Sequence, residues 1–100
     1  MKYSVRQDGE WAVVSIQGAL NIKNSDQIRS AFDRIVSDGA RKVRLELEMV
    51  PVADSAGIGS ILILLRNLQE RKGTLEIKGA SKNLSEMFKL LKIDKVIKIK

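Results

Sequence analysis

The dipeptide Asp54-Ser55 is the place in this 100-residue chain where side-chain types and spacing point to chemistry. It precedes the segment Ile58 to Leu68, whose apolar residues recur at the spacing of an α-helix. Either residue is a favoured N-cap, and the unpaired N–H groups and dipole of a helix start favour an anion. A hydroxyl at Ser55 therefore lies where a phosphate would be stabilised.

Two glycines, Gly57 and Gly59, lie in the first turns of this predicted helix. Capping by Asp54 or Ser55 is common and by itself needs no function. Each glycine, however, costs about 1 kcal/mol of helix propensity relative to alanine, which indicates that something approaches the backbone closely. The approaching group is either another element of the chain, such as the sheet, or the surface of a partner.

A short strand is predicted before this segment. Val43 to Met49 alternates apolar and polar residues, and Pro51 lacks the N–H that a central ladder needs, so pairing should end near it. Glu46 and Glu48 are two residues apart and share the polar face of this strand. We expect the pKa values of both carboxyl groups to stay ordinary there.

The residue types exclude most enzyme chemistry. The chain contains no histidine and no cysteine, which removes the commonest general base, the commonest zinc ligand and every disulfide. It has no glycine-rich phosphate loop and no metal-ligand spacing. We therefore expect a protein that is not an enzyme, with no catalytic residue, no cofactor and no metal.

Composition predicts one domain over residues 1–100, with 44% hydrophobic and 30% charged residues. No apolar run is long enough to span a bilayer and no secretory signal is visible, so we expect a cytoplasmic protein without membrane contact. The net charge of +6 leaves nucleic-acid binding as a weaker alternative, because the basic residues are dispersed and only four aromatic residues exist. Five lysines between Lys89 and Lys100 form either a solvated face or a docking surface.

Periodicity predicts a β-β-α-β-α-β-α-β order, hence a single small α/β domain with a mixed or mostly parallel sheet of about four to five strands. The hairpin turn is expected at Gln7 to Glu10 with Asp-Gly at its centre, and Gly18 to Asn24 is expected to be a loop. The expected strands are Tyr3–Arg6, Trp11–Gln17 (central), Val43–Met49, Thr74–Lys78 and Ile93–Ile99 (at an edge, given its lysines). The expected helices are one capped by Asn24 or Ser25 and ending at Gly39, one at Ser55–Lys72, and one capped by Ser81 that buries Leu84, Met87, Phe88 and Leu91.

Residues 45–59, LELEMVPVADSAGIG, resemble the signature of STAS domains, the family of bacterial anti-sigma-factor antagonists, which runs roughly L-D-L-S-x-V-x-F-I-D-S-S-G-L-G. The resemblance extends through element order along nearly the whole chain and implies a STAS-like fold. It also implies that Ser55 is the residue phosphorylated by the anti-sigma factor, itself a serine kinase. The chain departs from the pattern at Glu46, at Val52-Ala53 and at Ala56, which replaces a second serine and leaves one hydroxyl.

The function implied by the resemblance is that of an anti-sigma factor antagonist. The unphosphorylated chain would bind the kinase and release it after phosphorylation of Ser55, and a phosphatase could reset the switch. Asn21 stands where the family has an aspartate near the site, although a plain turn residue is the other interpretation. The residues expected to bind the partner are Asp54, Ala56, Gly57, Ile58, Gly59 and Asn21.

A second interpretation has the same STAS-like fold but no switch by phosphorylation of Ser55. A STAS-like domain can also be a non-catalytic scaffold or sensing subunit of a larger signalling or transport complex. A Ser55→Ala form with unchanged regulation would favour this alternative.

Overall fold

A five-stranded mixed sheet runs through the computed structural model, which describes residues 1–100. The strands lie side by side in chain order, with β1 antiparallel to β2 and all later neighbours parallel. The strands are β1 (Lys2–Asp8), β2 (Trp11–Gln17), β3 (Lys42–Met49), β4 (Thr74–Lys78) and β5 (Lys98–Ile99). The helices are α1 (Ser25–Ser37), α2 (Ser55–Glu70) and α3 (Lys82–Leu90), with 3₁₀ turns η1 (Ile22–Asn24) and η2 (Ile93–Lys95). The predicted α/β class and element order are confirmed.

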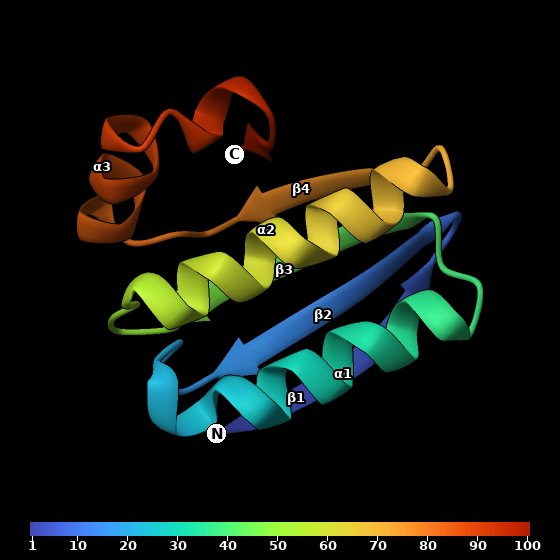
Figure 1. The fold of residues 1–100 in the computed structure, drawn as a ribbon, viewed down its shortest axis with the longest axis horizontal. Coiled ribbons are helices and arrows are strands. Elements are labelled where there is room, and N and C mark those ends of the chain that lie inside the picture. Colours follow the sequence, from blue (N-terminus) through green and yellow to red (C-terminus); the bar gives the residue numbers. More distant parts are fainter.

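Helices α1 and α2 cover one face of the sheet, and α3 lies beyond the end of β4 (Figure 1). The alternation of β2 and β3 directs one set of side chains, including Val14 and Leu45, toward these helices. The apolar stripes of the helices meet that face and complete a single core, as the sequence periodicity predicts. The core contains 23 buried residues, among them Ile28, Phe32, Ile61, Leu64, Leu68, Ile77 and Phe88.

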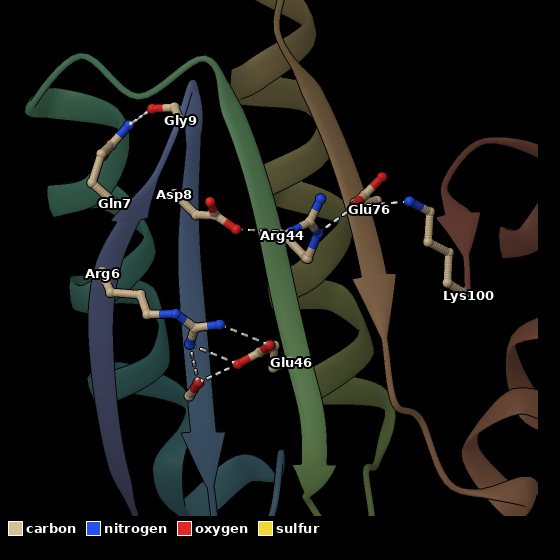
Figure 2. Close-up of polar contacts among 9 residues, drawn as sticks. Arg6, Gln7, Asp8, Gly9, Arg44, Glu46, Glu76 and Lys100 are labelled. Carbon is tan, nitrogen blue, oxygen red and sulfur yellow. Dashed lines mark hydrogen bonds and ion pairs between the residues drawn. The ribbon is translucent and has the colours of Figure 1, made fainter.

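The opposite face of the sheet carries charged side chains in place of helices (Figure 2). Arg6 on β1 forms an ion pair with Glu46 on β3 at 2.9 Å, and Ser15 between them donates to Glu46 at 2.7 Å. Arg44 pairs with Glu76, lies 3.9 Å from Asp8, and its guanidinium stacks over the Trp11 ring at 4.8 Å. Cross-strand pairing thus satisfies the charges of this face without a covering layer.

Glu46 corrects a prediction made from the strand pattern. Hydrogen bonds from Arg6 and then Ser15 lower the pKa of its carboxyl to about 2, against an ordinary value of 4.5. The expectation of an ordinary pKa was wrong because Arg6 comes from another strand, 40 residues away in the chain. On the polar face of a sheet, a long side chain such as Arg6 can reach across the intervening strand β2 to a carboxylate on β3.

The predicted last strand, Ile93–Ile99, is the largest error in the elements. Residues 93–95 form η2, and only Lys98 and Ile99 pair with β4, at the predicted edge position. Leu91 is also not part of the buried stripe, since 54% of its surface is exposed. The chain turns there because Lys92 has a left-handed backbone, with φ of 59°.

Smaller differences concern turns and caps. The hairpin turn is one residue later than predicted: Gly9 and Glu10 lie between the paired residues Asp8 and Trp11, with φ of +61° at Gly9. Asn24 stands at the N-cap of α1, but its side chain donates to the Ala19 carbonyl instead of capping the helix. Strand β2 lies inside the sheet and β3 ends at Met49, before Pro51, as predicted. No helix has the length and apolarity needed to cross a membrane.

Candidate functional site

Two loops meet where β2 and β3 end. The Gly18 N–H donates to the Met49 carbonyl at 3.1 Å, and the Leu20 N–H donates to the Val52 carbonyl at 3.0 Å. The Asp54 N–H returns a bond to the Leu20 carbonyl at 2.9 Å. Residues 18–22 and 49–54 therefore continue the parallel pairing of the sheet beyond its regular strands.

Asp54 fastens these loops to the start of α2. One carboxylate oxygen accepts the Gly57 N–H at 3.0 Å, which is the N-cap bond of the helix, and the other accepts the Ile22 N–H at 3.0 Å. The Gly57 bond is the main cause that lowers the pKa of the Asp54 carboxyl, and the Ile22 bond acts in the same direction. Asp54 is thus an ionised link between the helix and a loop distant in sequence.

Gly57 and Gly59 have different surroundings. A Cβ atom at Gly57 would overlap the Leu20 carbonyl oxygen and backbone, whereas a Cβ at Gly59 would meet nothing within 4 Å. The close approach predicted at Gly57 is made by the chain's own loop, not by the sheet. Gly59 leaves open space at the surface of α2.

The other predicted residues of α2 divide between surface and core. Ser55 is the first residue of the helix and is exposed, while Ala56 is half-buried. Ile58 is only 5% exposed and belongs to the hydrophobic core, so it supports the helix from below. The structure brings Ser55 and Asp54 together at the helix start, as the sequence predicts.

Asn21 acts as a turn residue in this fold. Its side-chain oxygen accepts the Asn24 N–H at 3.1 Å and caps η1, inside a segment predicted as plain loop. The hydrogen bond from this loop to Asp54 comes instead from the next residue, through the Ile22 backbone. Half-buried Asn21 therefore shapes the loop that reaches the site.

Three exposed apolar side chains of this region were not singled out from the sequence. Ile22, Met49 and Val52 are 68%, 60% and 57% exposed, and all three lie in the two joined segments, where Met49 is the last residue of β3. The exposure of these side chains is hard to predict from the sequence, because an apolar residue at the end of a strand normally belongs to the hydrophobic core. Exposed apolar groups gathered near one site are typical of protein-binding surfaces.

The family profile of the STAS domain matches residues 2–100 of the chain. BtrV of Bordetella bronchiseptica, described as a candidate anti-sigma factor antagonist, is 24% identical over 90 residues, which are 90% of this chain and 78% of BtrV. The family predicted from residues 45–59 is thereby confirmed over nearly the full sequence.

Solved structures show the same fold. TM1081 of Thermotoga maritima, described as a candidate anti-sigma factor antagonist, has a TM-score of 0.91 at 21% identity, covering 97% of this chain and 84% of that one. Phosphorylated SpoIIAA of Bacillus has a TM-score of 0.76 at 20% identity, covering 99% and 91%. A sulfate transporter family protein of Wolinella succinogenes has a TM-score of 0.76 at 17% identity, covering 90% and 73%. With its family profile matched from end to end and its fold shared with these proteins, the chain belongs to the STAS domain family.

Proposed function

We propose that this chain is an anti-sigma factor antagonist, a non-catalytic protein whose binding to a serine-kinase anti-sigma factor is switched at Ser55. One observation carries the proposal: the exposed Ser55 hydroxyl begins α2 beside the capping carboxylate of Asp54, at the position that the STAS signature assigns to the phosphoacceptor. The name of BtrV, a relative at 24% identity, supports the same function.

The unphosphorylated surface suits a protein partner. Exposed Ile22, Met49 and Val52 supply apolar area that a partner would bury, while Ser55 and Gly59 leave room at the helix start. Asp54 and Asn21 contribute by holding the loops in place. The effect on partner binding of Ala56, Gly57 and Ile58 would be indirect, because these residues fix the position of α2.

Phosphorylation would change the charge of this surface. A phosphate on Ser55 adds roughly −1.5 to −2 charges at neutral pH. It would stand next to the ionised Asp54, which already occupies the Gly57 N–H. Repulsion between the two anions and the cost of desolvating them would weaken the docked state and release the kinase. A phosphatase would restore the binding form, and the switch would operate in the cytoplasm.

The first experiment is phosphosite mapping by mass spectrometry on the chain recovered from its own cells, with co-purifying proteins identified in the same run. Phosphate on Ser55 together with an ATP-binding kinase would support the switch. An unmodified Ser55 under every growth condition, with no kinase retained, would overturn it.

The scaffold alternative is favoured by the fold likeness to a sulfate transporter family protein. In that case the chain would be recovered with a membrane or signalling complex. A Ser55→Ala form would then retain full regulation, whereas the switch predicts a form that stays permanently bound to the kinase.

A further inference from the structure

The two edges of the sheet are protected to different degrees. Strand β5 has only two residues and is followed by Lys100. A short edge strand and a lysine at the edge both keep a sheet from pairing with other chains. Strand β1 has seven residues, all exposed, and pairs with β2 without a bulge or a proline. Its outer side is a long edge that carries the charged residues Lys2, Arg6 and Asp8 but no bulge and no proline.

The hairpin fixes which backbone groups of β1 are free. The two-residue turn closes on the pair Asp8–Trp11, which is hydrogen-bonded in such hairpins. Hydrogen-bonded and non-hydrogen-bonded pairs then alternate along an antiparallel ladder. The N–H and C=O groups of Tyr3, Val5 and Gln7 therefore point away from β2, toward solvent.

The same three residues carry their side chains on the helix-covered face. Tyr3 and Val5 are 39% and 47% exposed, although both belong to a sheet face that is otherwise core. A groove of about 590 Å³ lies between them and α1, with Ala31 and Ile35 among its walls. The edge thus offers unpaired backbone groups beside a groove whose lining is half apolar and half polar.

We propose that β1 pairs antiparallel with β1 of a second copy, about a two-fold axis at Val5. Val5 then faces Val5 of the second copy, and Tyr3 faces Gln7, so all outward backbone groups of these residues find partners. Each Tyr3 ring would pack beside the partner's groove. The two five-stranded sheets become one continuous sheet of ten strands.

Charge selects this register. With the axis at Val5, Lys2 of each copy faces Asp8 of the other, which gives two opposite-charge pairs. A shift by one hydrogen-bonded pair in one direction puts Lys2 opposite Arg6, and a shift in the other direction puts Arg6 opposite Arg6. Like charges directly opposite are destabilising, so among the registers that pair five or more residues of β1, only the Val5-centred one is self-complementary in charge.

The pair would leave both Ser55 sites accessible. Lys2, at the start of β1, faces Gln17 at the end of β2, where the site's loops begin. The two-fold axis reverses the direction of the sheet, so the sites lie at opposite ends of the pair. Pairing through β1 is therefore compatible with partner binding at Ser55 and does not require it.

Sedimentation equilibrium over a concentration series tests the pairing. We expect the wild-type chain to approach twice the 11.2 kDa of one chain as concentration rises. Val5→Pro removes one N–H that points outward and breaks no hydrogen bond to β2. The variant protein should therefore stay at the mass of one chain, and its circular dichroism spectrum should match that of the wild type. A wild type that stays at 11.2 kDa at its highest soluble concentration would overturn the proposal.

A charge-exchange cycle tests the register and does not rely on the fold tolerating proline. Lys2→Asp and Asp8→Lys should each weaken dimerisation roughly tenfold, because each places like charges opposite one another twice. The double variant K2D/D8K should restore it, while Lys95→Asp, the same charge change on η2, should have no effect. Failure of the double variant to recover, or a dimer indifferent to Val5→Pro, would show that association uses another register or another face.

Discussion

The Asp54 carboxylate holds the Ile22 backbone, since its Oδ2 atom accepts the Ile22 N–H at 3.0 Å across 32 residues of sequence. The other oxygen caps α2 through Gly57. One side chain therefore fixes the loop after β2 and the helix after β3 relative to each other.

Asp54→Ala should separate the loop from the helix. Loss of an N-cap costs about 1 kcal/mol, and the Ile22 N–H also loses its acceptor. Amide hydrogen exchange at Ile22 and Gly57 should accelerate, and binding to the proposed kinase partner should weaken. Ser81→Ala is the matched control, because Ser81 caps α3 through the Leu84 N–H away from the site. It should cost similar stability and leave binding intact, and equal effects of both variants on binding would refute this role of Asp54.

Gly57→Ala and Gly59→Ala should have opposite effects on the free energy of unfolding. Alanine at Gly59 enters open space and should stabilise α2 by about 1 kcal/mol. Alanine at Gly57 meets the Leu20 carbonyl, and overpacking of this kind costs about 1–3 kcal/mol. Urea unfolding of the two variants measures the difference directly. A stabilised Gly57→Ala would mean that the loop around Leu20 moves aside freely.

Ser55→Asp should weaken binding of the proposed anti-sigma kinase through its added charge beside Asp54. Ser55→Ala should bind at least as well as wild type and resist release by ATP. Titration calorimetry with the kinase recovered in the first experiment measures both. Ser30→Asp places the same charge on an exposed position of α1 and should bind normally. A loss of binding in that control as large as in Ser55→Asp would indicate a general charge effect.

Glu46 should give the protein part of its resistance to acid. Its folded pKa of about 2 lies below the ordinary value of 4.5, so its contribution to stability is complete above about pH 4.5. The contribution is lost as the pH falls from there toward about 2. Glu46→Gln should lower stability at neutral pH and flatten this acid limb, measured by urea unfolding over a pH series. Glu86→Gln on α3 serves as the control, and an acid limb that stays as steep in Glu46→Gln as in that control would contradict the assignment.

The parts of the fold set by local pattern were predictable from the sequence. Strand β2, the start of α2 at Ser55 and the cap at Ser81 follow from periodicity and capping chemistry. The error at Ile93 to Ile99 has a physical cause, since Ile93 and Ile97 are both buried while Val96 is 55% exposed. A spacing of four between buried residues belongs to a helical turn, and the nearby alternating residues concealed it.

The contacts of the site were less predictable because they join distant segments. The residues near Gly57 in the sequence do not indicate that Leu20 approaches it. The residues near Glu46 likewise do not indicate that Arg6 donates a hydrogen bond to it. The sequence resemblance predicted Ser55 and Asp54 as site residues but did not indicate what the second carboxylate oxygen of Asp54 would bind. Such pairings depend on strand order, which the local pattern does not encode.

The hydrogen bonds that join residues 18–22 to residues 49–54 have a kinetic consequence. A surface already ordered by its own backbone loses little conformational entropy when a partner docks, so it is preorganised for binding. Association should then proceed in one step, at a rate set by diffusion and orientation, with little change of shape in this chain. A modification of such a surface would therefore change chiefly the dissociation rate of the complex, and with it the lifetime of the bound state.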